Sequence, residues 1–220
     1  MVVAASPDEW LVQRAQAGMR ALISYEPTRG LRQDRQLAGL IGHGGTWKLL
    51  LEGGDKTETW TADWEVGQQQ HPAQRIWRVR YTLSGEPTEL KRSDSRPLDS
   101  VISDLQQALM KIIEFCSDHK LEARVFRKSL ECLSATHPLE LIPHPDLCPD
   151  GLLARPALQV LAASQAAWVF GTMGSWNDLG FDGSEQDRYE SVSDDLFKAI
   201  NEAVVSSVNS VERRQDRTSN

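Results

Sequence analysis

The residue types best suited to metal chemistry in this sequence, cysteine and histidine, gather between residues 116 and 148. All three cysteines and three of the five histidines lie there. Three pairs have spacings that would let both side chains bind one zinc ion, namely Cys116 with His119, Cys132 with His137, and His144 with Cys148. Cys116 also continues an apolar stripe, where a buried cysteine without metal is expected. We predict no cofactor, and a zinc site in this region is the alternative.

A second candidate set contains two carboxylates and a lysine. Asp63 lies in a segment of alternating apolar and polar residues, and Glu89 and Lys91 follow the next such segment. Metal-dependent nucleases use a carboxylate followed by a Glu-x-Lys pattern to hold a metal ion and steady the attacking water. Solvated strand ends carry the same residue types without any chemistry. A small metal-dependent hydrolase of phosphodiesterase or nuclease type, using these three residues, is therefore our alternative function.

Backbone amides for a developing oxyanion could come from residues 42–45, which read Gly-His-Gly-Gly. Esterases with such a loop also need a Gly-x-Ser-x-Gly turn. No serine here has those neighbours, and Ser175 follows Gly174 directly. We interpret residues 42–45 as a turn that leads into a strand. Because no complete set of nucleophile, base and stabilising group is present, we lean away from an enzyme.

The sequence contains seven tryptophans, whose rings could stack on a sugar or a base. Four of them, Trp47, Trp60, Trp64 and Trp77, alternate in step with leucine, alanine and valine along three segments of two-residue period. That pattern is typical of strands with one buried face. We therefore predict that these four side chains belong to the core.

Residues 169–180 concentrate three glycines, Trp176 and an Asn-Asp pair between two predicted helices. Gly171 stands where a helix C-cap is expected, and Asn177 and Asp178 can shape a turn through their own side chains. An ordered connection of about a dozen residues is uncommon enough to suggest a function. We predict Trp176, Asn177 and Asp178 as binding residues. The alternative is that they only shape the loop.

This loop also carries a resemblance. The run from Trp168 to Asp178, with the acidic helix after it, resembles a recurrent Phe-Gly-x-Met-Gly-Ser-Trp-Asn-Asp segment of uncharacterised bacterial proteins of similar size. The resemblance covers about residues 160–205. It implies a bacterial origin and a shared C-terminal structure, and it implies no activity.

The helices and strands expected from the sequence indicate an α+β fold. It consists of a small antiparallel β-meander packed against helices, with a helical C-terminal half. A Ser-x-x-Glu capping box at Ser6 begins a helix that we extend to residue 24. The helix that starts near residue 99 should cover the apolar face of the sheet. Residues 121–134 are ambiguous, and we interpret them as a helix. The other predicted elements are strands around 47–51, 60–64 and 77–83, and helices over 156–170 and 184–208.

Composition limits the function. At 220 residues we predict one domain over residues 1–208 and a disordered tail over 209–220. The odd number of cysteines favours a reducing, cytoplasmic location, and we expect neither a signal peptide nor a membrane segment. A net charge of −7 disfavours nucleic acid. We predict a non-catalytic cytoplasmic protein-binding domain, in concrete form an immunity-type inhibitor of a basic partner protein. The sequence leaves the oligomeric state open.

Overall fold

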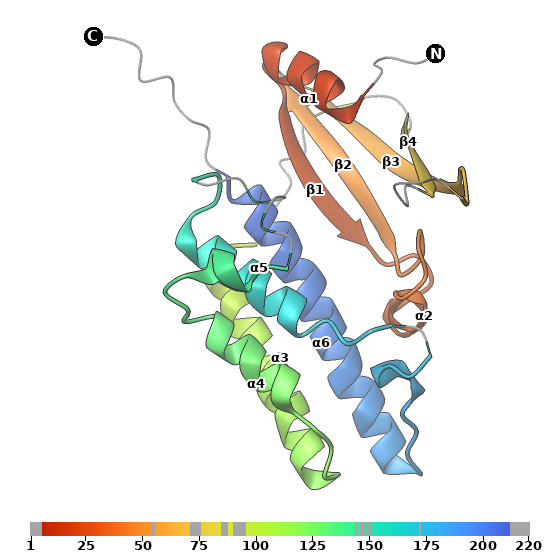
Figure 1. The fold of residues 1–220 in the computed structure, drawn as a ribbon, viewed down its shortest axis with the longest axis vertical. Coiled ribbons are helices and arrows are strands. Elements are labelled where there is room, and N and C mark those ends of the chain that lie inside the picture. The colour runs from red at the N-terminus through yellow and green to blue at the C-terminus, as the bar shows by residue number, and fades with distance from the viewer. Residues whose placement is uncertain are drawn as a thin grey trace. The chain divides into compact units, whose positions relative to one another are not determined.

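The computed structural model describes residues 6–53, 56–70, 76–84, 88–89, 96–143, 145, 148, 151–171 and 173–211 (Figure 1). It has an antiparallel sheet and a helical C-terminal half, so the predicted α+β class is confirmed. The chain divides into two compact units, residues 1–94 and 95–220, and each is described by itself. The single domain over residues 1–208 stays a prediction. Most of the predicted tail, residues 212–220, lies outside the described residues.

Unit 1 is built on an antiparallel meander in the order β1-β2-β3-β4, with β5 paired to β3. The strands are β1 (Arg20–Glu26), β2 (Thr46–Gly53), β3 (Lys56–Val66), β4 (Trp77–Leu83) and β5 (Thr88–Glu89). The register pairs Leu49 with Trp60, and Trp64 with Val79. Cross-strand partners point to the same face of a sheet. The predicted apolar residues therefore do share one face.

The helix predicted over residues 6–24 is wrong in its second half. Helix α1 (Pro7–Gln16) begins as expected, with the Ser6 hydroxyl accepting a hydrogen bond from the Glu9 amide at 3.2 Å. It ends early, because Gly18 has a φ of +77°, and residues 20–26 form β1, paired along their length with β2. Leu22 fits the helical spacing of the apolar residues before it, and it fits the two-residue alternation of a strand equally well. Pairing with a distant segment decided between the two patterns.

Two helices accompany the sheet of unit 1. Helix α1 lies on the apolar face, where the Trp10 ring is 4.8 Å from that of Trp60 and both side chains are buried with Leu51. A helix that the sequence analysis missed, α2 (Leu31–Leu37), is fixed by the buried Asp34. The Asp34 carboxylate accepts the Thr28 amide at 2.6 Å.

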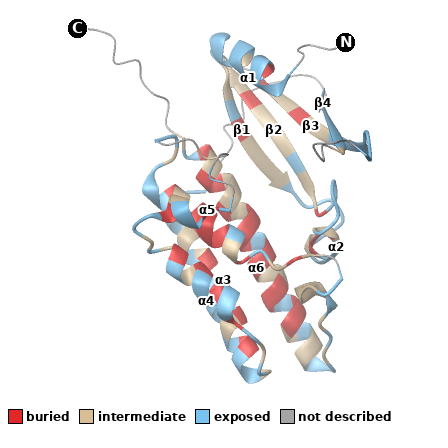
Figure 2. Cartoon of the chain, viewed as in Figure 1, coloured by how far each residue is buried: buried red, intermediate tan, exposed pale blue. Residues whose placement is uncertain are grey.

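Unit 2 is helical throughout its described part. Its elements are α3 (Leu98–Asp118), α4 (Arg124–Cys132), the 3₁₀ turn η1 (Pro138–Leu141), α5 (Arg155–Ala166), the 3₁₀ turn η3 (Trp176–Asp178) and α6 (Ser184–Asn209). The ambiguous segment is thus a helix, as interpreted. The buried residues of α3 form the predicted stripe, which includes Leu105, Ile112 and Cys116. Figure 2 shows buried residues along α3, α5 and α6.

The predicted partner of α3 was wrong. Its apolar stripe packs against α6, with further contacts to α4 and α5, whereas the helix packed on the sheet within unit 1 is α1. A helical period shows that one face is buried. It does not show which element buries that face, because a helix in a bundle and a helix packed on a sheet have the same pattern.

Candidate functional site

The three predicted binding residues form the 3₁₀ turn η3 within the loop that joins α5 to α6. Asn177 donates through Nδ2 to the Gly171 carbonyl at 3.2 Å. The Asp178 carboxylate accepts a hydrogen bond from the Gly174 amide, and Gly174 has a φ of +78°, which favours glycine. The Ser175 hydroxyl accepts the Asn177 amide at 3.3 Å. Both polar side chains therefore hold the shape of the loop.

Trp176 ties this loop to the helices. Its Nε1 donates to the Ser193 hydroxyl of α6 at 2.8 Å, and its carbonyl accepts the Tyr189 hydroxyl at 2.5 Å. The ring meets Phe126 of α4 edge-on at 5.4 Å and also contacts Phe115 of α3 at 6.4 Å. These contacts support the alternative that the motif shapes the loop. Binding by the three residues remains a prediction.

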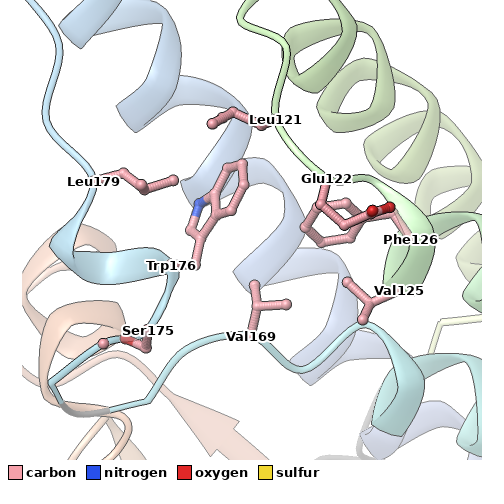
Figure 3. Close-up of a pocket in the computed structure, with 9 residues that line it drawn as sticks. Leu121, Glu122, Val125, Phe126, Val169, Ser175, Trp176 and Leu179 are labelled. Atoms are coloured by element: carbon pink, nitrogen blue, oxygen red, sulfur yellow. The ribbon is translucent and has the colours of Figure 1, made fainter.

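A shallow pocket of about 270 Å³ opens beside Trp176, between the loop and the start of α4 (Figure 3). Its apolar lining consists of Leu121, Val125, Phe126, Val169, Trp176 and Leu179. Trp176 is the one predicted site residue that lines this pocket. Asn177 and Asp178 do not belong to the lining. The structure thus brings together one predicted residue and several that the sequence analysis did not single out.

A basic row lies next to this pocket on α4. Arg124, Arg127 and Lys128 are exposed and line a second depression of about 500 Å³, together with Glu122 and Glu131. Glu122 lines both depressions, so they are neighbours. Within the described part of the chain, the three basic side chains form no ion pair. Their spacing of three and four residues was a signal that the sequence analysis did not use.

The cysteine and histidine residues are not arranged as a metal site in the described residues. No group of three or more His, Cys, Asp or Glu side chains is close enough to hold a metal there, and His144 lies outside that part. His119 pairs with Glu185, with 2.8 Å between Nε2 and Oε2. Burial raises the pKa of the Cys116 thiol to about 11 and also raises that of Cys132. Both thiols are therefore neutral at pH 7 in the metal-free protein.

The register of the sheet places Asp63 and Glu89, two residues of the alternative hydrolase site, far apart. Glu89 pairs with Lys56, seven residues along β3 from Asp63, which is on the order of 23 Å at about 3.3 Å per residue. Asp63 pairs with Arg80 and accepts a hydrogen bond from the Thr82 hydroxyl at 3.3 Å. Lys91 lies outside the described residues. The backbone positions of residues 63 and 89 are therefore too far apart for a single metal ion to be bound from both.

The glycine-rich residues 42–45 form the turn that was predicted before β2. Gly44 and Gly45 have φ values of +83° and +98°, and a Cβ atom on Gly45 would overlap the Tyr25 ring. The Tyr25 hydroxyl donates to the Gly44 carbonyl at 3.0 Å. The glycines allow this close approach of the backbone to an aromatic ring.

The prediction that four tryptophans belong to the core is wrong for three of them. Trp60 is 7% exposed, whereas Trp47, Trp64 and Trp77 are 38%, 47% and 39% exposed. Val66, Val79, Tyr81 and Leu83 on the same face of β3 and β4 are exposed as well. The period of two correctly placed all of them on one face. Helix α1 buries that face around Leu51 and Trp60 through Trp10, whose ring also stacks on Tyr81 at 6.4 Å.

Comparisons with known proteins do not assign this chain to a family. No family model, curated protein or solved structure matches this chain. The resemblance of the segment around Trp176 to bacterial proteins therefore stays a prediction. In the described part of the chain, no helix has the length and apolar character needed to cross a membrane.

Proposed function

We propose that this protein is a non-catalytic binding domain for another protein. The observation that carries this proposal is the exposed apolar face of β2, β3 and β4, which we call the tryptophan face. It consists of Trp47, Trp64, Val66, Trp77, Val79, Tyr81 and Leu83. Their exposed fractions correspond to on the order of 500 Å² of apolar surface, at the upper end for the largest patch on a monomer. Patches of this size mark interaction sites.

The chemistry of the tryptophan face also fits a protein partner. Tryptophan and tyrosine are the residue types most enriched at the centres of protein interfaces, where they bury large areas and lose little conformational freedom. The face contains three tryptophans and one tyrosine. Along β4 its apolar residues alternate with Arg78 and Arg80, whose side chains reach Glu65 at 3.3 and 3.8 Å. Because successive side chains of a strand point to opposite faces, both arginines lie on the face opposite the tryptophan face.

Net charge suggests which partner such a face would meet. At −7 the chain attracts basic proteins through its long-range field. An immunity-type inhibitor of a basic partner is the specific form of the proposal. Cys116, Cys132 and Cys148 are free thiols, which supports our placement of the protein in the reducing cytoplasm. The separation of Asp63 from Glu89 gives the hydrolase alternative no support.

The test is capture of partners from a lysate of the source organism at moderate salt. Wild-type protein is compared with a Trp64→Ser, Val79→Thr double variant and with a control, Glu65→Gln, on the opposite face of the same strand. We expect one stoichiometric protein partner with wild type and control, and its loss with the double variant. The unfolding midpoint must show that the double variant is folded. Equal capture by all three proteins would contradict the tryptophan face as the binding site.

A further inference from the structure

Unit 2 has a second surface whose chemistry differs from that of the tryptophan face. It combines the apolar pocket beside Trp176 with the basic row on α4, and we call it the α4 surface. We propose that the α4 surface binds an extended acidic segment of a partner protein, with one large apolar side chain of that segment in the pocket. This inference goes beyond the proposed function, because it assigns a separate site and an occupant of opposite local charge.

The pocket has the size and rigidity to hold one side chain. At about 270 Å³ it lies below the range of about 300–1,000 Å³ for small-molecule sites. Phe126 and Trp176 meet edge-on at 5.4 Å, and the bond from Trp176 to Ser193 fixes the indole ring. Val125, which is 39% exposed, lines the pocket from α4. A preformed aromatic pocket loses little conformational entropy when it binds a side chain.

The positive charges of the basic row destabilise the start of α4, the helix on which they lie. Arg124 is the first residue of α4, and Arg127 and Lys128 follow at i+3 and i+4 on the same face. Positive charges near a helix N-terminus oppose the helix dipole, and like charges at this spacing repel each other. The first turn of α4 contains no acidic residue. A locally unfavourable arrangement without a structural partner is typical of a binding site.

The two nearby acids offset part of the charge of the row, but neither forms an ion pair with it in the described structure. The Glu122 carboxylate accepts the Arg124 backbone amide at 2.8 Å, so it is directed toward the end of the helix. Glu131 lines the same depression and follows Lys128 by three residues on α4. The two arginines therefore remain available for bidentate contacts with carboxylates.

The occupant follows from combining the two parts. Carboxylates would pair with the row, while an aromatic or leucine side chain enters the pocket next to Val125. Nucleic acid is the less favoured anion, because single strands are bound by grooves in which bases stack on aromatic rings, and the depression that contains the row is lined by charged side chains alone. A short acidic peptide with one apolar residue satisfies both requirements.

The experiment measures fluorescence anisotropy of a labelled peptide, Asp-Glu-Glu-Phe-Glu-Asp-Glu, with the full chain at low salt. The test protein is an Arg124→Gln, Arg127→Gln, Lys128→Gln variant. The matched control is Arg155→Gln, because Arg155 is likewise the exposed first residue of a helix, α5. We expect saturable binding to wild type and to the control, and affinity about tenfold weaker for the triple variant. Replacing the peptide phenylalanine by serine should also weaken binding.

Three results would overturn the proposal. They are absence of saturable binding up to about 1 mM peptide, equal affinity of wild type and triple variant, and equal affinity for a single-stranded DNA oligomer of similar charge. Circular dichroism checks that the triple variant keeps its helices. The Trp64→Ser, Val79→Thr variant should bind the peptide normally, so failure of the tryptophan face and failure of the α4 surface are distinguishable.

Discussion

Trp176 anchors its loop to the surrounding helices, so it has a structural role whether or not the loop binds a ligand. Its indole nitrogen, its carbonyl and its ring all have partners on α3, α4 or α6. The sequence identified the residue as a large anchor in a glycine-rich loop. It could not show that these partners come from three helices, because the contacts join residues far apart in the chain.

Removal of the Trp176 ring should therefore destabilise unit 2. We expect Trp176→Ala to lower the free energy of unfolding by about 3 kcal/mol, from lost packing and from the lost hydrogen bond between the indole N–H and the Ser193 hydroxyl. Met173→Ala in the same loop is the control, since Met173 is 95% exposed, and its effect should stay within about 0.5 kcal/mol. Urea unfolding followed by circular dichroism measures both. Equal stability of the two variants would show that the indole ring is not an anchor.

One buried group, Cys116, and one half-buried group, Tyr25, predict a loss of stability at alkaline pH. Burial raises the pKa of Cys116 from 9.0 to about 11, and burial, with the nearby Asp34 carboxylate, raises that of Tyr25 from 10.0 to about 12. The fold favours the neutral form of each group. Their contribution is fully present below the unfolded pKa and is lost as pH rises through the folded pKa. Stability should therefore fall between about pH 9 and pH 12.

Urea midpoints measured across this range test the prediction. Tyr25→Phe removes the tyrosine ionisation, so its stability should depend less on pH above about 10 than that of wild type. The variant also loses the hydrogen bond to the Gly44 carbonyl, which lowers stability by a similar amount at every pH below that range. A wild-type midpoint that is constant from pH 8 to pH 12 would contradict the burial of both groups.

Among the secondary-structure elements of unit 1, α1 is the helix that packs on the apolar face of the sheet, and its buried residue is Trp10. Trp10 is 8% exposed and packs on Trp60 and Leu51. We expect Trp10→Ala to cost about 3–5 kcal/mol and to increase amide exchange in β2 and β3. Val12→Ala, at an exposed position of the same helix, should leave exchange unchanged. Hydrogen exchange with mass spectrometry compares the two, and unchanged exchange in Trp10→Ala would refute this role of α1.

At the scale of the whole molecule, the division near residue 94 predicts partial independence. A fragment of residues 95–220 contains α3, α4, α5 and α6, whose apolar faces pack on each other. We expect this fragment to be helical and to unfold in one cooperative thermal transition. Circular dichroism and calorimetry measure this. A fragment that shows no transition would instead support the single domain over residues 1–208.

Local structure was predictable from the sequence wherever a pattern of residues fits only one type of element. The capping box at Ser6, the alternation along β2 to β4 and the period of α3 and α6 each led to the correct type of element. These features depend on neighbours within a few residues, which the sequence displays directly. The turn at residues 42–45 was predictable for the same reason, because consecutive glycines favour few other structures.

Which faces pack together and which stay exposed depended on contacts between distant parts of the chain. Periodicity placed Trp47, Trp64 and Trp77 on an apolar face but could not show that α1 leaves them exposed. It marked the stripe of α3 but not its partner α6, and it could not exclude the strand at residues 20–26. Likewise, the register that separates Asp63 from Glu89 and the packing that places Trp176 beside α4 join distant parts of the chain. Such contacts are chosen by the free energy of the assembled fold, which no local pattern contains.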